Sequence, residues 1–304
     1  MPADVLLPPT LRAGDKIRFV SPASTPDENA VLQRKAVLES WGFKVDFGQH
    51  VFREKGFLAG TDEERLADLN AALRDREVRA IFATRGGKGS YRIADQLDFD
   101  AARADPKFLI GFSDITILHL SLWRHCNLVG IHGALMDENG SFTAANSEAL
   151  RSALMSSDDI RIQSRAEEPT SALTTRGTAM GRLLGGNLEM IATAAGWALP
   201  DLADAILLLE AVNMHVGQVD RQLTMLRKAG RLNGVAGVAV GQFTGFNPNA
   251  SVPIVDLLRD HLERLGVPTV GGLPLGHGRE PLSVPIGCMA TLDAAAGTLT
   301  VSWE

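Results

Sequence analysis

The sequence predicts an α/β protein built around a parallel sheet. Over the first half of the chain, short apolar runs alternate with segments of helical period, which is the pattern of βαβ units. Two of the apolar runs lead directly into loops, at Arg85 and Ser113, and the carboxyl edge of such a sheet is where ligands bind. We therefore expect an N-terminal domain of the flavodoxin or Rossmann type, followed by a smaller C-terminal α/β domain with β-rich elements.

The N-terminal elements follow from hydrophobic period and from stop and start signals. Helix 27–41 has apolar residues on one side and is ended by Gly42, and Thr61-x-x-Glu64 is a capping box that opens a helix through Leu73. A further helix is expected over 114–125. The expected strands are 16–21, 43–47, 78–84, 108–112 and 128–131.

A polar stretch of weak periodicity, residues 155–178, predicts a linker between domains 1–154 and 179–304. In the second domain, a helix opens at Gly185-Gly186-Asn187, and the apolar run 205–210 predicts a strand that ends in Glu210. Further elements are expected as a helix over 219–229, a strand over 235–240, a helix over 252–265 and short strands near the C-terminus.

Composition excludes several classes of protein. The 304 residues are 45% hydrophobic and 22% charged with a formal net charge of −6, which fits a globular chain and opposes nucleic-acid binding. Only Cys126 and Cys288 are present, which favours a reducing compartment. With neither a signal-peptide pattern at the N-terminus nor a long apolar run, a cytoplasmic protein without membrane contact is expected.

A serine lies where an apolar strand meets a helix, in the segment KFLIGFSDIT. Such a turn exposes a hydroxyl beside the N–H groups of a helix N-terminus, so Ser113 is a candidate nucleophile. Gly111 fits the first position of the α/β-hydrolase elbow, but Ile115 occupies the last, where glycine belongs. A plain helix cap by Ser113 or Asp114 is the alternative.

Two residues of the second domain supply partners for a serine nucleophile. Glu210 ends an apolar run where a carboxylate is costly unless paired, and His277 lies between glycines in GLPLGHG. Either could instead be merely solvated. Ser113, Glu210 and His277 follow the chain order Ser–Glu–His of α/β-hydrolases, and together they predict a catalytic triad as a hypothesis.

The segment RGGKGS, residues 85–90, follows a buried strand. Its glycines allow close approach to an anion, but Gly89 follows Lys88 and Phe82 stands where a phosphate loop needs its first glycine. A plain tight turn, or a loop that donates N–H groups to a neighbouring active site, is favoured over nucleotide binding. His132 is a candidate substrate contact, and no His, Cys, Asp or Glu spacing indicates a metal site.

The chain resembles the LD-carboxypeptidases (muramoyltetrapeptide carboxypeptidases, peptidase family S66), which include the microcin C immunity hydrolases. The resemblance spans nearly the whole chain through motifs in the same order: LRAGDKIRFVSPAS, ATRGGKGS, KFLIGFSDIT, IHG, GRLLGGNL, ILLLE, VDRQLTML, VGQFTG and GLPLGHG.

The resemblance implies a serine carboxypeptidase that removes the terminal D-alanine from murein tetrapeptides in peptidoglycan recycling, with no cofactor and as a homodimer. Ser113 corresponds to the nucleophile, Glu210 to the orienting carboxylate and His277 to the base. The N–H groups of Gly87 and Asp114 correspond to the oxyanion hole. An exopeptidase must also recognise a free carboxylate, and Arg85 or Lys88 is expected to bind it because of its charge.

Five residues depart from the family pattern: Lys88, Ala134, Ala211, Gly217 and Gln218. None belongs to the expected triad, but they bear on the substrate. Three alternatives therefore stay open. They are a hydrolase of microcin C-like aminoacyl-nucleotide amides with the same fold, an esterase of the α/β-hydrolase type, and a non-enzymatic nucleotide-binding module.

Overall fold

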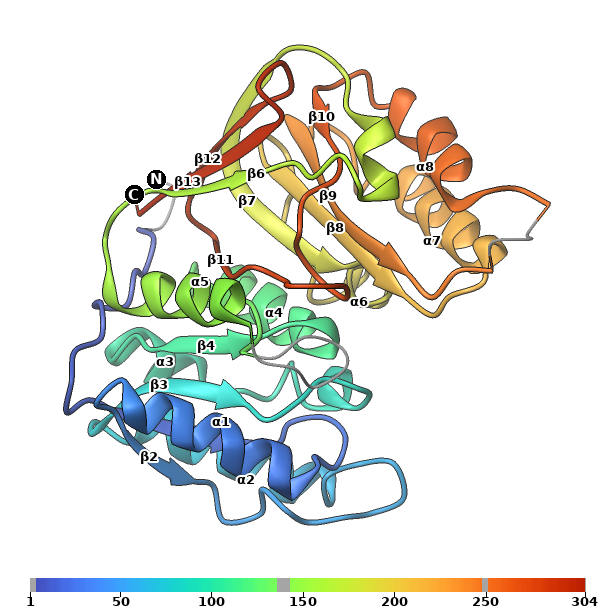
Figure 1. Cartoon of the computed structure of the whole chain (residues 1–304). Coiled ribbons are helices and arrows are strands. Elements are labelled where there is room, and N and C mark those ends of the chain that lie inside the picture. The colour runs from blue at the N-terminus through green and yellow to red at the C-terminus, as the bar shows by residue number, and fades with distance from the viewer. Residues whose placement is uncertain (1–3, 136–142, 248–250, 304) are drawn as a thin grey trace.

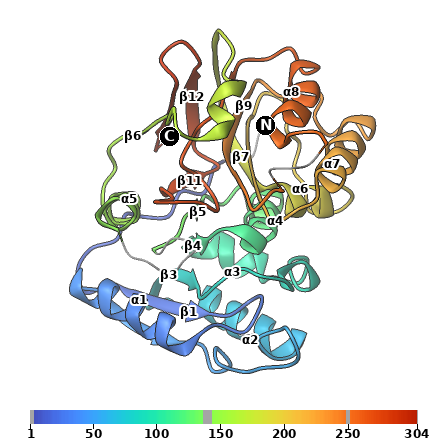
Figure 2. The same cartoon turned by 45° about the vertical axis from the view of Figure 1, so that its right-hand side comes forward.

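The computed structural model describes residues 4–135, 143–247 and 251–303. These residues form two sheets that lie in separate halves of the molecule (Figures 1 and 2). Within the described ranges, no helix has the length and apolar character needed to cross a membrane.

The first sheet carries the N-terminal half. Five of its strands are parallel to one another, and the sixth, β11, runs antiparallel to β5 at the edge. In spatial order the strands are β11 (Val284–Ile286), β5 (Gly130–His132), β4 (Phe108–Gly111), β3 (Val78–Ala83), β1 (Lys16–Val20) and β2 (Lys44–Phe47). The expected parallel α/β sheet is confirmed.

The second sheet is mixed. Four neighbouring strands are parallel and three antiparallel strands extend them. In spatial order they are β10 (Thr269–Val270), β9 (Gly237–Thr244), β8 (Ile206–Val212), β7 (Thr178–Asn187), β12 (Met289–Asp293), β13 (Thr298–Ser302) and β6 (Ile160–Gln163).

Helices cover both sheets. They are α1 (Glu28–Ser40), α2 (Asp62–Arg74), α3 (Phe99–Ala104), α4 (Thr116–Cys126), α5 (Ala144–Met155), α6 (Leu188–Ala194), α7 (Val216–Lys228) and α8 (Ile254–Glu263), with 3-10 turns η1 (Ser90–Arg92), η2 (Ser113–Ile115) and η3 (Pro169–Leu173). The capping box at Thr61 is confirmed, since its hydroxyl accepts from Glu64 N–H and the Glu64 carboxylate accepts from Thr61 N–H.

Some elements differ from the sequence expectation. The segment 155–178 contains β6, an alternating strand with Ile160 and Ile162 that lies in an otherwise polar stretch and pairs with β13. The helix expected from Asp114 is divided into η2 and α4. The glycine-rich strand β7 was not anticipated, because glycine weakens the strand signal.

The chain passes between the two sheets near its C-terminal end. β10 belongs to the second sheet, whereas β11, which follows it, pairs with β5 of the first sheet. The intervening segment 271–283 therefore runs across the junction, where Figure 1 shows it in red between the two halves.

Helix α4 joins the halves from the other side. It packs against α6 and β7, and the Thr116 hydroxyl at its start accepts the Asn187 N–H at 3.0 Å. Thr116 is fully buried, so the Asn187 N–H has no access to water at this contact.

The Thr116→Val substitution removes this acceptor while keeping the shape of the side chain. Because the Asn187 N–H is then buried without its partner, we expect the free energy of unfolding to fall by about 1–3 kcal/mol in urea titrations. The matched control is Thr193→Val, whose exposed hydroxyl donates to the Glu189 carbonyl within α6. Equal losses in the two variants would contradict the role given to Thr116.

The buried His119 links stability to pH. Its Nε2 lies 3.0 Å from the Leu109 carbonyl, and burial lowers the pKa of His119 to about 4. Between that value and the unfolded pKa of about 6.5, the unfolded chain takes up a proton that the folded chain does not. Stability contributed by the neutral imidazole is therefore lost as the pH falls through this window.

We expect wild type to lose about 2 kcal/mol more stability than His119→Gln when the pH is lowered from about 7 to about 5, as measured by urea unfolding. Gln33→Asn, at an exposed position of α1 without an ionisable side chain, is the control and should follow wild type. An identical pH dependence in wild type and His119→Gln would refute this linkage.

Candidate active site

Ser113 lies at a sharp turn between strand and helix. β4 ends at Gly111, η2 begins at Ser113 and α4 continues from Thr116. The backbone of Ser113 is left-handed, with φ of 63°, which is costly for a residue with a side chain. This conformation gives the turn the character of a nucleophile elbow, although the glycine pattern of that motif is incomplete.

Glu210 and His277 form a tight pair on the other side of the junction. The His277 Nδ1 lies 2.6 Å from the Glu210 Oε2. Glu210 belongs to β8 of the second sheet and is fully buried, whereas His277 lies on the segment that crosses between the sheets and is partly exposed. A carboxylate at this position accepts the Nδ1–H and leaves Nε2 as the basic nitrogen.

Charge keeps Glu210 ionised despite its burial. Desolvation alone would raise the pKa of Glu210, but the charge and the hydrogen bond of His277 outweigh it, and the pKa lies below its usual value. Gly276 makes this approach possible, since a Cβ there would lie 2.7 Å from the Glu210 side chain. A larger residue at position 276 would therefore collide with the Glu210 side chain.

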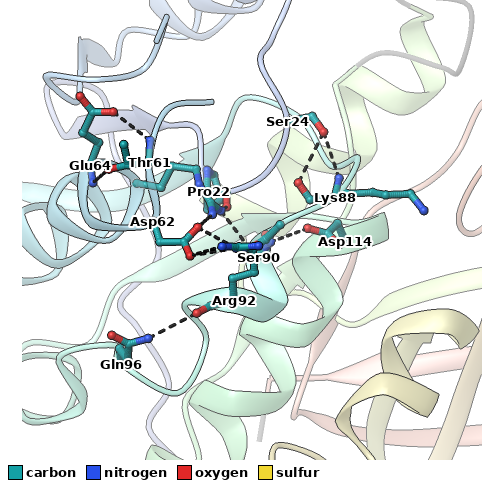
Figure 3. Close-up of polar contacts among 12 residues, drawn as sticks. Pro22, Ser24, Thr61, Asp62, Glu64, Lys88, Ser90, Arg92, Gln96 and Asp114 are labelled. Carbon is teal, nitrogen blue, oxygen red and sulfur yellow. Dashed lines mark hydrogen bonds and ion pairs between the residues drawn. The ribbon is translucent and has the colours of Figure 1, made fainter. Parts of the chain in front are cut away.

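The segment 85–90 is fastened at three points, two of which Figure 3 shows. The Ser24 hydroxyl accepts the Lys88 N–H at 3.0 Å, and the Asp114 carboxylate accepts the Ser90 N–H at 2.8 Å. The buried Arg65 donates to the Gly89 carbonyl at 2.9 Å. Asp114 therefore ties this loop directly to the turn that carries Ser113.

The fastened loop passes close over the serine. A Cβ at Gly86 would lie 2.8 Å from the Ser113 Cβ and 3.1 Å from its Oγ. Gly87 has a φ of 108°, which a residue with a side chain rarely adopts. Small residues at both positions allow the backbone to lie against the hydroxyl.

Ser113 and His277 line one pocket of about 290 Å³, in which Gly86 and Gly87 also take part. Its other described lining residues are Pro26, Asp27, Ala30, Arg34, Phe82, Ala83, Thr84, Arg85, Gly111, Phe112, Ile115, Gly133, Ala134 and Leu135. The Phe112 ring lies 4.7 Å from the His277 ring, centroid to centroid, and so packs beside the imidazole. The pocket combines a hydroxyl, an imidazole, exposed backbone and an apolar wall.

The three expected substrate contacts occupy different places. Arg85 lines the pocket, whereas Lys88 is exposed and is not among the described residues that line it. His132 is buried behind the pocket, near Glu210 and His277, and burial lowers the pKa of His132 to about 4. Neither ring nitrogen of His132 has a hydrogen-bond partner among the described residues.

Sequence reasoning did not identify Arg34. It lies on α1, lines the pocket and donates to the Thr84 carbonyl. Nothing in the sequence marks it, because a lone arginine on an amphipathic helix usually faces solvent. Ser24 was also missed, since its role depends on a contact with a loop far along the chain.

The positions that depart from the family pattern also have defined places. Ala134 lines the pocket, and Ala211 is buried in β8 next to Glu210. Gln218 caps α7 by accepting the His215 N–H, and Gly217 precedes it there. In the described ranges, no group of three or more His, Cys, Asp or Glu side chains is placed to hold a metal ion.

Comparison with known proteins connects this geometry to a family. The model of the LD-carboxypeptidase N-terminal domain (peptidase S66) matches residues 17–133, and that of the C-terminal domain matches residues 180–292. A Bacillus subtilis protein named "Probable murein peptide carboxypeptidase" is 32% identical over 97% of this chain and 93% of its own length.

Solved structures agree with these matches. The crystal structure of muramoyltetrapeptide carboxypeptidase from Oxalobacter formigenes is 27% identical, with a TM-score of 0.83 over 94% of this chain and 98% of that one. The microcin C7 self-immunity protein MccF in complex with aspartyl sulfamoyl adenosine has the same fold, with 22% identity and a TM-score of 0.87 over 98% of both chains. The chain therefore belongs to the LD-carboxypeptidase family, peptidase S66, and it carries the serine turn, the Glu–His pair and the two sheets described above.

Proposed function

We propose that this carboxypeptidase is a serine enzyme that removes the terminal D-alanine from murein tetrapeptides in peptidoglycan recycling. The observation that carries the proposal is the 2.6 Å Glu210–His277 pair, whose imidazole lines the same pocket as Ser113. The relatives named for murein peptides supply the substrate class.

The triad would work in two steps. In the first, Ser113 Oγ attacks the carbonyl carbon before D-alanine while His277 Nε2 takes the hydroxyl proton. The same nitrogen then gives that proton to the leaving amine, and an acyl-enzyme remains on Ser113. In the second step, water gives a proton to His277 Nε2 and attacks the ester carbonyl. The ester bond breaks, His277 returns that proton to Ser113 Oγ, and the shortened peptide leaves with a new carboxylate.

The charges of the site suit this sequence. Glu210 is held ionised, so it stabilises the imidazolium that forms in each step and fixes the tautomer of His277. The proposed oxyanion hole consists of the N–H groups of Gly87 and Asp114, and each such donor typically contributes about 10²–10³ in rate. Asp114 would thus provide its N–H to the oxyanion and its carboxylate to the Ser90 N–H.

Membership in a carboxypeptidase family favours amide hydrolysis over the esterase and nucleotide-binding alternatives. A microcin C-like aminoacyl-nucleotide amide is the second candidate substrate, because MccF shares the fold. We also propose a cytoplasmic location and a homodimer, both of which rest on the sequence and its family resemblance. Arg85 remains a candidate for the substrate carboxylate because it lines the pocket.

Mass spectrometry of murein tetrapeptide incubated with the protein tests the proposed activity. We expect the loss of one terminal D-alanine, and Ser113→Ala should lower turnover by at least about 10³-fold because the nucleophile is gone. Ser40→Ala, which changes an exposed serine at the end of α1, is the control and should behave as wild type. Intact tetrapeptide together with cleavage of an aminoacyl-nucleotide amide would move the assignment to the second candidate.

Glu210→Gln tests the pairing with His277. The amide retains the size of the side chain but loses the charge that stabilises the imidazolium, so kcat should fall by about 10³–10⁴-fold. Steady-state kinetics measure the loss, and circular dichroism verifies the fold. Glu263→Gln on the exposed face of α8 is the control. Near-wild-type turnover of Glu210→Gln would rule out an essential pair.

A further inference from the structure

Two guanidinium groups line the pocket that contains Ser113. Arg34 comes from α1, and Arg85 follows β3. Backbone carbonyls hold both: Arg34 donates to Thr84 O, and Arg85 Nη1 donates to Thr25 O at 3.2 Å. Both side chains therefore have a fixed attachment at the wall of the pocket that also contains the serine.

The two cations are near enough to affect one another. Burial, together with the charge of Arg85, lowers the pKa of Arg34 to about 10, while Asp27 acts in the opposite direction. Arg34 is still charged at neutral pH. The described lining residues thus include two guanidinium groups and one carboxylate, Asp27, which also caps α1 by accepting the Ala30 N–H at 2.7 Å.

An anionic ligand would relieve the repulsion between these cations. The planar fork of arginine matches a carboxylate with two parallel hydrogen bonds, which a lysine cannot offer. Lys88 is a weaker candidate for binding the carboxylate, because it is not among the described residues that line the pocket. Figure 3 shows its side chain extending away from the contact between Ser90 and Asp114.

We propose that Arg34, together with Arg85, binds the free carboxylate of the substrate's C-terminal residue and makes the enzyme an exopeptidase. This inference rests on the proposed function of Ser113 and adds the group that selects the substrate. Phe82, Ala83 and Leu135 supply apolar wall in the same pocket, as a small side chain beside that carboxylate requires.

The test compares two substrates that differ only at the selected group. One is murein tetrapeptide with a free terminal carboxylate, and the other is the same peptide with a terminal carboxamide. Wild type should prefer the acid by about 100-fold in kcat/KM. In Arg34→Gln, kcat/KM should fall at least about tenfold more for the acid than for the amide, mainly because KM rises. The preference of Arg34→Lys for the acid should lie between those of wild type and Arg34→Gln.

The matched control is Lys35→Gln. It removes a positive charge from the neighbouring position of α1, where Lys35 pairs with Glu39 outside the pocket. Its preference for the acid should equal that of wild type, which separates a local contact from the general field of the helix. Binding of the tetrapeptide to Ser113→Ala and to Ser113→Ala/Arg34→Gln, followed by calorimetry, gives a readout without turnover, in which the second variant should bind about tenfold more weakly.

The outcomes are distinguishable. Wild type that cleaves neither peptide overturns the proposed function and this inference with it. Active wild type together with an unchanged acid preference in Arg34→Gln, or with equal losses on both substrates, overturns the role of Arg34 alone. If Lys35→Gln lost the preference for the acid over the carboxamide, a specific contact of Arg34 with the carboxylate would also be overturned. The preference would then come from the long-range charge of α1.

Discussion

The pairing of β11 with β5 is the constraint on which the site depends. This strand comes from the C-terminal part of the chain but completes the edge of the first sheet. The preceding β10 belongs to the second sheet, so the segment between them must bridge the two. His277 lies on that bridge, which places its imidazole against Glu210 of one sheet and in the pocket of Ser113 from the other.

Helix α4 also joins the two halves, because the hydroxyl of its first residue, Thr116, accepts a hydrogen bond from the Asn187 N–H. Asn187 pairs in register with Glu210 across β7 and β8, so the same contact that closes the junction lies beside the acidic member of the pair. The relative position of serine and imidazole is therefore set by backbone pairing and buried hydrogen bonds, which are less yielding than contacts between long side chains.

Local signals in the sequence were enough to mark Ser113 and Glu210, although the strand expected to end at Glu210 continues as β8 to Val212. Ser113 and Glu210 each follow an apolar run, and polar groups in such places need a reason. The bridge by β11 was beyond reach, because a three-residue strand has no detectable period and its partner lies far away in the chain. Strand β6 was not predicted because its four residues lie in a polar stretch and its partner β13 is also far away in the chain. No local sequence pattern predicts the role of Arg34 either, because only folding brings α1 next to the loop that follows β3.

The three fastenings of the segment 85–90 have a kinetic consequence. Ser24, Arg65 and Asp114 hold this backbone in place within the folded protein itself. Its ordering entropy is therefore lost during folding rather than when a peptide arrives. Association with the substrate does not have to wait for this loop to close, and the rate of encounter at this wall of the pocket is governed by diffusion and charge.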